Sequence, residues 1–489
     1  MAAKTENANS WVYRGEGNRC LAVGNSFSNE VYLLTKLRDK VSSHEVCADV
    51  KRSVQNEVDF GRCVLRPLIG EKYVPVGKVV CVSKDFLSQI EEKMRKHRSS
   101  RRLLEKLDPA GFAVCLPDAC SLPKVVGSYG HGPVVCVEVK PKTGFLPRSS
   151  TIPVAHHKIR QSVCRYCMQQ CLKLHQGKIQ ERSQYCPLDL FSGTACRMDL
   201  AIKALVRNPQ NNFKVFRDGH VIYSGDTENH QQPLQDCLTA LFTGNDKDSK
   251  YALPGDLGTQ KIDGLVDRFS ELLRQMLVHP LDESESCYGN TTPSTTPECC
   301  TESRAKLQQG DSQLGLVPGS VLYNILHAQQ LDVLDIEGIY PLYQRLVAHL
   351  DAHPEDWDTW CLKGPYDNTQ WTVNHNVVKK CIENIDSIES VVALVKAFLV
   401  SLTAKDGSVM VAMQRVENGA DVTLPVVTDT VGNKYMFNIQ VVDTKPKPLH
   451  RIQKYFSLNK DIVQAYIQTV GYSSDGTIVK QEASEESVK

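Results

Sequence analysis

The order of apolar and polar residues predicts a mixed α+β chain whose first part is rich in strands. Residues 11–23 alternate around a glycine-rich turn, which predicts two strands joined by a hairpin, and residues 72–83 form a second β-rich stretch. Residues 86–102 have the spacing of an amphipathic helix, whereas residues 111–119 predict a further strand. Together these elements predict a small mixed unit in the first part of the chain.

Helical periodicity dominates the later part of the chain. We expect helices within residues 197–206, 320–338, 340–350 and 387–404, and strands at residues 409–413 and 434–442. Residues 283–315 are rich in Ser, Thr, Pro and Glu, which is typical of a disordered insert or a long surface loop, and residues 473–489 form a loose acidic tail. We therefore expect two domains, residues 1–117 and residues 118–489, with the insert and the tail in the second.

The composition restricts the kind of site that the chain can carry. Its 489 residues include 57 basic and 56 acidic ones, so the overall field does not attract nucleic acid or membranes and any polyanion site must be local. We find no apolar leader and no run of about 18 apolar residues, so the 18 cysteines indicate reduced thiols. We expect a monomer of the cytosol or nucleus that requires neither nucleic acid nor a membrane.

Residues 134–147 (VVCVEVKPKTGFLP) combine an apolar run with charges at every second position. Glu138, Lys140 and Lys142 would emerge on one face if the strand continued through them. Two ammonium groups beside a carboxylate at a strand end can bind phosphates. The alternative is an ordinary edge strand with a charged face.

Two aspartates near the C-terminus lie on elements that phosphotransferases use. A helix is expected to end at Ala404, Asp406 follows it in a Lys-Asp-Gly turn, and Asp443 comes where the second of two strands ends. Kinase-like enzymes place one aspartate beside the attacking hydroxyl and another at a strand end to hold Mg²⁺. Asp-Gly is also common in plain turns, which is the alternative for Asp406.

Basic residues follow Asp443 with helical spacing. Pro448 suits the first position of a helix, and Lys447, Arg451 and Tyr455 would then lie at i, i+4 and i+8 on one face. They would converge on an anion at the start of the helix, where free N–H groups and the helix dipole assist. The alternative is a solvated basic face, which is also the simpler interpretation of the basic run at residues 93–102.

A cluster of cysteines and histidines has the spacing of a zinc site. Cys164 and Cys167 form a CxxC motif, His157 precedes it and Cys186 follows it. Other candidates for the fourth position are His156, Cys171 and His175. We expect a structural zinc, with buried reduced thiols as the alternative; a nucleic-acid module here is disfavoured because few aromatic residues lie among the basic ones.

The turn at residues 15–18 (GEGN) lies between two expected strands. Its glycines would allow backbone N–H groups to approach phosphates closely. The turn matches neither the Walker motif nor the Rossmann fingerprint, and a simple hairpin turn is the alternative.

Taken together, these segments resemble the inositol-pentakisphosphate 2-kinases, most closely the animal type. The similar segments are GEGN at 15–18, EVKPKTGFLP at 138–147, YCPLDLFSG at 185–193, PQNNFKVF at 209–216, LDIEG at 334–338, TAKDGSVM at 403–410 and the run at 443–455. The resemblance implies a two-lobed kinase-like α+β fold that binds ATP with Mg²⁺ between the lobes. It also implies phosphorylation of the 2-hydroxyl of inositol 1,3,4,5,6-pentakisphosphate to the hexakisphosphate, phytate. A non-catalytic inositol-phosphate-binding protein on the same fold is the alternative.

The resemblance also implies roles for individual residues. Asp406 matches the catalytic aspartate, with Lys140 beside it, and Asp443 matches the Mg²⁺ ligand. ATP would be bound by Gly15, Glu16, Gly17, Asn18, Arg38, Asp118, Glu138 and Lys140. The inositide would be bound by Arg102, Lys140, Lys142, Lys173, Asn211, Lys214, Lys447, Arg451 and Tyr455. The structural zinc would be held by His157, Cys164, Cys167 and Cys186, as a feature of the animal members.

Two departures from the family pattern are visible. Gln169 stands where the family often has a histidine, so one phosphate contact would become an uncharged hydrogen bond. The basic residue expected on the strand near residues 33–37 has two candidates, Lys36 and Arg38, both shifted in register. The contacts of that strand with ATP are therefore open.

Overall fold

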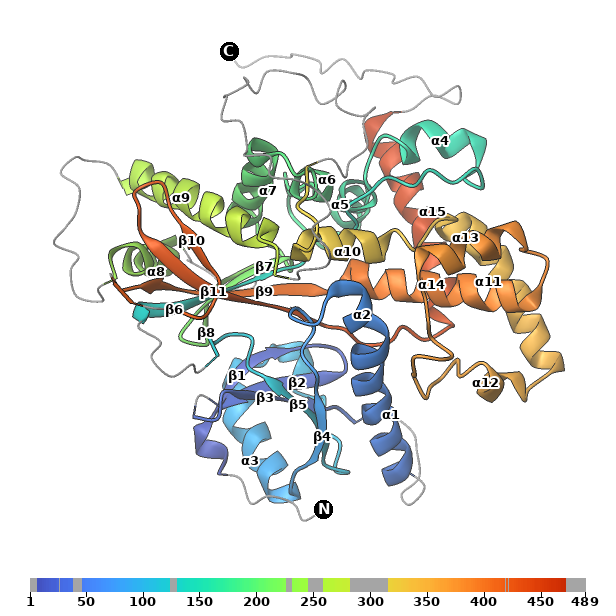
Figure 1. Ribbon diagram of the computed structural model, residues 1–489, viewed down its shortest axis with the longest axis horizontal. Coiled ribbons are helices and arrows are strands. Elements are labelled where there is room, and N and C mark those ends of the chain that lie inside the picture. The colour runs from blue at the N-terminus through green and yellow to red at the C-terminus, as the bar shows by residue number, and fades with distance from the viewer. Residues whose placement is uncertain are drawn as a thin grey trace.

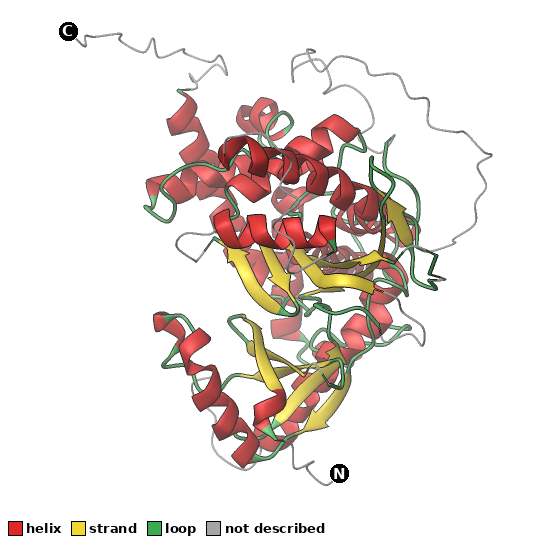
Figure 2. Ribbon diagram, turned by 90° about the vertical axis from the view of Figure 1, so that its left-hand side faces the viewer, coloured by secondary structure: helices red, strands yellow, loops and turns green. Residues whose placement is uncertain are grey.

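A computed structural model of the protein describes residues 7–25, 27–37, 46–123, 130–225, 231–244, 258–281, 315–417, 419–420 and 422–471. The chain is a mixed α+β structure with a five-stranded and a six-stranded sheet, both antiparallel throughout (Figure 1). Figure 2 shows the two sheets one above the other, with most helices gathered beyond the six-stranded sheet. The expected insert at 283–315, except Gly315, and the tail at 473–489 lie outside the described residues.

The five-stranded sheet comes from the first part of the chain and has the order β1-β2-β3-β5-β4. Its strands are β1 (Trp11–Glu16), β2 (Cys20–Asn25), β3 (Glu30–Thr35), β4 (Lys78–Cys81) and β5 (Phe112–Pro117). The predicted hairpin at 11–23 is confirmed, because β1 and β2 pair in antiparallel register around the turn at 15–18. The strand predicted within 111–119 is β5.

Two helices cover the faces of this sheet. On one face α3 (Lys84–Met94) packs Phe86 against Trp11, with ring centroids 5.7 Å apart. On the other face α1 (Val46–Phe60) packs Val54 and Val58 against the strands. The sequence analysis did not predict α1, although valines at positions 50, 54 and 58 have the spacing of a helix face.

The helix predicted for residues 86–102 is shorter than expected. It ends at Met94 and is followed by 3₁₀ turns at Arg95–His97 and Ser100–Arg102. Arg98, between the turns, is extended and donates hydrogen bonds to both carboxylate oxygens of Glu16. Pairing with a distant carboxylate therefore replaces the last helical turns.

The six-stranded sheet has the order β10-β11-β9-β6-β7-β8. Its strands are β6 (Gly130–Val139), β7 (Phe213–Arg217), β8 (His220–Ser224), β9 (Ser408–Val416), β10 (Val426–Thr428) and β11 (Lys434–Val442). The strand pair predicted at 409–413 and 434–442 is confirmed as β9 and β11. Strand β9 is antiparallel to both β6 and β11. The start of β9 therefore lies beside the last residues of β6 and β11, at one end of these strands.

Most of the remaining helices build one large core on the six-stranded sheet. The remaining helices are α2 (Arg66–Ile69), α4 (Val154–Arg160), α5 (Arg165–His175), α6 (Pro187–Leu190), α7 (Ala195–Arg207), α8 (Gln231–Thr243), α9 (Gly258–Val278), α10 (Val321–Gln329), α11 (Asp335–Ala352), α12 (Asp356–Thr359), α13 (His375–Glu383), α14 (Ile388–Asp406) and α15 (Arg451–Val470). Of these, α4 packs in a smaller cluster with α5 and α15. The predicted helices at 197–206 and 387–404 are α7 and α14. The two predicted at 320–338 and 340–350 correspond to α10 and α11, but the break between them lies at residues 330–334, so residues 335–338 belong to α11. Within the described residues, no helix meets the length and apolarity that crossing a membrane would need.

Residues 60–74 leave the first sheet and join this larger core. Phe60, Leu65 and Ile69 are buried within it. The carbonyl oxygen of Tyr73 accepts a hydrogen bond from the Val441 N–H at 2.7 Å, and the Tyr73 hydroxyl donates to the Gly319 carbonyl at 2.7 Å. This segment therefore fastens the two sheets to each other before the chain returns as β4.

Three local predictions near the expected site are wrong. Strand β6 ends at Val139, because Pro141 has no N–H and Lys142 takes a left-handed conformation with φ of 63°. Asp406 is the last residue of α14 instead of part of a following turn. Helix α15 begins at Arg451, three residues after Pro448, so Lys447 lies in the extended segment before the helix.

Candidate active site

A cavity of about 230 Å³ lies between the two sheets. Ala22 and Leu33 line it from the five-stranded sheet, and Phe216 and Met410 from the six-stranded sheet. The same cavity is lined by charged side chains, including those of Glu138, Lys140, Asp443 and Lys445. Apolar walls suit a planar base and the charged side chains suit phosphates and a cation, so the cavity has the chemistry of a nucleotide site.

The first charged cluster lies where β6 and β11 end and β9 begins. The Lys140 Nζ lies 3.0 Å from Asp443 Oδ2 and 3.5 Å from Glu138 Oε1. Ser408, the first residue of β9, donates from its hydroxyl to Glu138 at 2.9 Å and to Asp443 Oδ2 at 3.3 Å. The ends of adjacent strands thus bring Asp443 together with Glu138 and Lys140, although Asp443 is 303 residues from Lys140 in the sequence.

The charges of this cluster hold each other ionised. Burial by itself would lower the pKa of Lys140, but Asp443 and Glu138 raise it well above its ordinary value. Desolvation by itself would raise the pKa of Asp443, whereas Lys140, the Ser408 hydroxyl and Lys445 lower it. Among the described residues, Lys140 and Ser408 both contact Asp443 through Oδ2, and its side chain is 56 % exposed, so the carboxylate is accessible to a cation.

Asp406 forms the second charged cluster at the end of α14. Only Gly407 separates it from Ser408 and the first cluster. Lys447 donates to Asp406 Oδ2 at 2.8 Å, and the carboxylate is 57 % exposed. Desolvation would raise the pKa of Asp406, but Lys447 and Lys142 lower it below its ordinary value. Asp406 is therefore an ionised and accessible carboxylate, as a general base requires.

Lys142 lies near this carboxylate and Lys173 lies near Lys142, and neither lysine forms a salt bridge with a carboxylate of the described residues. Burial lowers the pKa of Lys142 to about 8; Asp406 opposes this shift, whereas Lys140 and Lys173 add to it. Burial and the charge of Lys178 likewise lower the pKa of Lys173 on α5. Cations that lose hydration without gaining a carboxylate are ready to bind an anion.

The structure adds Arg165, which lies within the CxxC segment and was given no role in the sequence analysis. Its guanidinium lies over the Tyr455 ring, 4.1 Å from the centroid, and its charge helps to lower the pKa of Asp406. Its Nε and one terminal nitrogen are buried and have no hydrogen-bond partner among the described residues. The spacing of residues along the sequence could have indicated this role for Arg165. Arg165, Gln169 and Lys173 lie at i, i+4 and i+8 along α5, which places them on one helix face.

The glycine-rich turn is held by two residues that were expected to contact phosphates. Glu16 is buried, with its side chain 1 % exposed, between Lys36 at 2.6 Å and Arg98 at 2.7 Å. Lys36 also donates to the Gly17 carbonyl at 2.8 Å, and Arg102 donates to the Glu16 carbonyl and to Asn18 Oδ1. Lys36 and Arg102 thus fix the backbone of the turn, and Arg38 lies outside the described residues.

The other expected ligands differ in their surroundings. Asp118 is buried and paired with Arg14 at 2.7 Å, while Lys214 lies 3.3 Å from Glu138. Asn211 is exposed in the turn before β7, and Arg451 is exposed at the start of α15. Asp118 and Lys214 line the cavity, whereas Asn211 and Arg451 lie outside its lining.

Glu57 on α1 is a further charged residue of the cavity that the sequence analysis missed. Its carboxylate lies 2.7 Å from Lys445 and 3.1 Å from Arg19. Lys445 is two residues beyond Asp443, and Arg19 directly follows the glycine-rich turn. Helix α1 is thereby connected to both the turn and the segment after β11.

The LDIEG segment at 334–338 has a structural explanation. Its Asp335 and Glu337 bind the buried guanidinium of Arg160 at 2.6 and 3.6 Å. Asn459 on α15 donates to the same Glu337 at 2.9 Å. The segment, which begins α11, therefore connects this helix to α4 through Arg160 and to α15 through Asn459.

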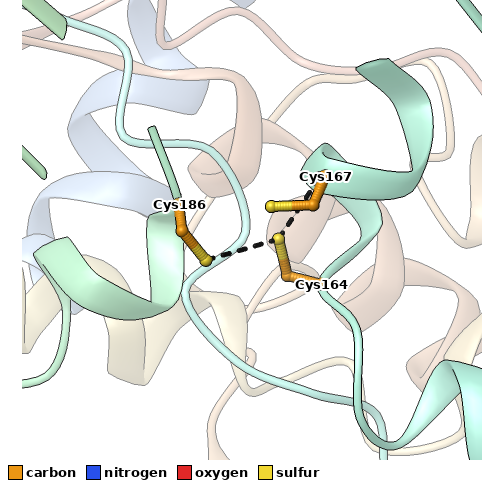
Figure 3. Close-up of side chains that lie close together, drawn as sticks. All are labelled: Cys164, Cys167 and Cys186. Atoms are coloured by element: carbon orange, nitrogen blue, oxygen red, sulfur yellow. Dashed lines mark hydrogen bonds between the residues drawn. The ribbon is translucent and has the colours of Figure 1, made fainter. Parts of the chain in front are cut away.

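The cysteines of the CxxC segment meet Cys186 in space. Figure 3 shows the sulfur atoms of Cys164, Cys167 and Cys186 pointing toward one another, and all three lie within 4.8 Å of each other. The sulfurs of Cys164 and Cys186 are 3.8 Å apart, as expected for two ligands about 2.3 Å from one tetrahedral zinc ion. Hydrogen bonds from the neighbouring thiols lower the pKa of Cys186 to about 3. Within the part of the chain that the structure describes, His157 is not in this group of three, although its Nε2 is buried and has no hydrogen-bond partner there.

Comparisons with known proteins agree with this geometry. A family model described as inositol-pentakisphosphate 2-kinase matches residues 13–461. The inositol-pentakisphosphate 2-kinase of Danio rerio is 32 % identical over 97 % of this chain and 96 % of its own length. That of Arabidopsis thaliana is 28 % identical over 95 % of each chain. The chain therefore belongs to the inositol-pentakisphosphate 2-kinase family.

Proposed function

We propose that the protein transfers the γ-phosphate of ATP to the 2-hydroxyl of inositol 1,3,4,5,6-pentakisphosphate, which yields the hexakisphosphate and ADP. The observation that carries this proposal is the pair of neighbouring clusters, Lys140 with Asp443 and Lys447 with Asp406. Phosphoryl transfer requires positioning and charge stabilisation more than covalent chemistry, and these groups can supply both.

Each cluster has a separate task in this proposal. Asp406 orients the 2-hydroxyl and accepts its proton as the bond to phosphorus forms. Lys140 stabilises the charge on the transferred phosphoryl group, and the carboxylate of Asp443 would hold Mg²⁺, which neutralises charge on the nucleotide phosphates when bound. Glu138 keeps Lys140 oriented from the nucleotide side. The backbone of the turn at 15–18 covers the phosphates of ATP.

The inositide would be bound by a ring of basic and polar residues around Asp406. Five phosphates carry more charge than one or two side chains can neutralise, so several separate cations are needed. We assign this task to Lys142, Lys173, Lys447, Arg451 and Tyr455, with Asn211, Lys214 and Arg102 further out, and add Arg165. The unpaired buried nitrogens of Arg165 support its inclusion, because a buried donor without a partner is costly.

The arrangement of the chain suits a two-lobed kinase-like fold. The N-terminal lobe would comprise residues 1–117 and the C-terminal lobe residues 118–489, with ATP bound between them. The position of the cavity between the two sheets supports this division. We treat the active enzyme as a monomer of the cytosol or nucleus.

The test of the proposed function is direct. Purified protein is incubated with ATP, Mg²⁺ and inositol 1,3,4,5,6-pentakisphosphate, and products are separated by ion-exchange chromatography. Formation of hexakisphosphate with stoichiometric ADP is expected. Tight binding of the pentakisphosphate without product would instead indicate the non-catalytic alternative.

The depressed pKa of Lys142 predicts how activity depends on pH. Lys142 is charged below its pKa of about 8 and loses its charge above it. Because only the charged form attracts phosphate, kcat/KM for the inositide is expected to fall by up to about tenfold per pH unit above this value. Lys142→Arg, which stays charged, should remove this decrease, and Lys173→Arg serves as the matched comparison. An unchanged profile in Lys142→Arg would contradict the assignment.

We also propose a structural zinc at Cys164, Cys167 and Cys186. Cys164 caps the start of α5 and Cys186 precedes α6, so the ion would join two helix N-termini of the large core. Three thiolates require one more ligand for a tetrahedral site, and His157 remains our candidate because its buried Nε2 is unpaired. Such a site suits a reducing compartment, where thiols do not form disulfides.

Elemental analysis should therefore find about one zinc per chain. Cys186→Ser is expected to lose the metal and to lower the unfolding midpoint by about 5 °C, since a cross-link within the core is lost. Cys196→Ser changes an exposed cysteine on α7 and should alter neither property. A stable, metal-free preparation of the unmodified protein would eliminate the zinc proposal.

A further inference from the structure

Gln329, the last residue of α10, uses its whole side-chain amide to hold backbone atoms of two functional segments. The residue is fully buried. Its Nε2 donates to the Lys142 carbonyl at 2.8 Å and to the Ala404 carbonyl at 3.3 Å, while its Oε1 accepts from the Gly144 N–H at 2.9 Å. A glutamine amide has two N–H donors, so both are used, and its oxygen is occupied as well.

The first of these segments is the loop that carries Lys142. The lysine has φ of 63°, which is uncommon for a residue with a side chain and persists only where surrounding contacts impose it. Two residues later, a side chain at Gly144 would collide with the Phe191 ring at 2.3 Å, so the loop passes through a restricted space. The hydrogen bonds of Gln329 on both sides of Thr143 hold the loop in this path.

The second segment is the end of α14. The carbonyls of the last helical turn have no partner within the helix, and Ala404 lies two residues before Asp406. The connection between α10 and α11 holds this helix end at two further points. Ser401 donates to the Gln329 carbonyl at 2.6 Å, and Lys405 binds the buried Asp332 at 2.6 Å.

We infer that Gln329 is a positioning residue that sets the distance between the Lys142 side chain and the Asp406 carboxylate. The inference rests on the proposed roles of those two residues. Gln329 does not line the nucleotide cavity. It acts through the backbone of the Lys142 loop and the backbone at the end of α14. A displacement of about 1 Å between a substrate-binding group and the base is sufficient to lower a reaction rate about 100-fold.

The test replaces the amide and keeps its length. Gln329→Met removes all three hydrogen bonds, and kcat is expected to fall about 10- to 100-fold while KM for ATP stays within about twofold. Gln329→Glu retains the acceptor for Gly144, but at neutral pH its carboxylate faces the Lys142 and Ala404 carbonyl oxygens, so kcat should fall at least as far as in Gln329→Met and recover in part as the pH is lowered and the carboxyl gains a proton. This second variant serves if the methionine variant does not fold.

A matched control separates positioning from general stability. Asn324, on the same helix, donates to the Ile69 carbonyl at 2.8 Å, far from Asp406 in the hydrogen-bond network. Asn324→Leu should lower the unfolding midpoint and leave kcat within about twofold at temperatures where both variants are folded. If both variants lost activity to the same extent, or if folded Gln329→Met kept its kcat, the inference would be overturned.

A double-mutant cycle tests whether the effect passes through Lys142. The Kd for the pentakisphosphate is measured for Gln329→Met, Lys142→Met and the double variant. Positioning predicts that the second substitution adds less than about threefold to the first, because the same contact is already lost. Full additivity would contradict the inference. Loss of activity in Asp406→Asn checks the proposed function separately, so the two failures are distinguishable.

Discussion

Asp406→Asn is expected to lower kcat about 10³-fold, because an amide cannot accept the proton of the 2-hydroxyl. Asparagine has the shape of aspartate and can still accept the hydrogen bond that Lys447 donates to Oδ2. The Kd for the pentakisphosphate should therefore change by less than about threefold. Single-turnover product formation measures the first quantity, and calorimetric titration measures the second.

A surface aspartate provides the control for this substitution. Asp351 is exposed on α11, and Asp351→Asn should leave kcat unchanged. If Asp406→Asn retained more than about a tenth of the wild-type kcat, the assigned base would be wrong. If it lost binding instead of turnover, Asp406 would serve to orient the cations and not to accept a proton.

Asp443→Asn is expected to raise KM for Mg·ATP at least tenfold and to lower kcat about 100-fold, because a neutral amide is a poor Mg²⁺ ligand. The substitution is also well suited to the backbone. Asp443 has φ of 63°, and asparagine tolerates this left-handed conformation better than most residues do. The loss should therefore come from the missing charge and not from strain. The measurement is initial rate as a function of free Mg²⁺ at fixed ATP.

The two asparagine variants control each other. The same chemical change occurs at both positions, yet Asp406→Asn should leave nucleotide binding intact and Asp443→Asn should leave pentakisphosphate binding intact. An unchanged Mg²⁺ requirement in Asp443→Asn would show that the metal is held elsewhere. Equal effects of both variants on both ligands would show that the two clusters act as one.

The described site neutralises its own charges. Lys140 lies against Asp443, Lys447 against Asp406, and Lys214 against Glu138. This pairing explains how a chain with nearly equal numbers of basic and acidic residues can carry a polyanion site. Under the proposed function, we expect phosphate binding to replace these carboxylate partners of the lysines with phosphate partners. Among the described residues, Lys142 and Arg165 form no salt bridge with a carboxylate, so under the proposed function we expect them to make the first contact with a phosphate.

Elements with a strong local period were predictable, and those whose ends depend on distant contacts were not. The apolar period of α14 and the β-rich runs of β9 and β11 identified those elements within a few residues. Helix α15 was predicted to begin at Pro448 because proline favours that position, but the helix begins at Arg451. Likewise, the helix after residue 86 ends early because Arg98 pairs with Glu16 across the sheet.

The prediction of individual site residues was limited in the same way. Asp406, Asp443 and Lys140 were recognisable because each lies at the end of a regular element. Arg165 and Glu57 were missed because their relevance comes from neighbours on other elements, Tyr455 for the first and Lys445 for the second. The contacts of Lys36 and Arg102 with the backbone of the glycine-rich turn likewise depend on the tertiary structure, because charge alone does not indicate them.

Local patterns along the chain were sufficient to identify the family, the α+β class and the charged residues from which the site is built. They suffice because periodicity and motif spacing are properties of short segments. The pairing of those charges, the path of the Lys142 loop and the burial of Gln329 depend on which strands and helices lie side by side. Contacts between residues more than 100 positions apart, such as Lys140 with Asp443, arise only when the whole chain packs, and so the tertiary structure alone defines the geometry of the site.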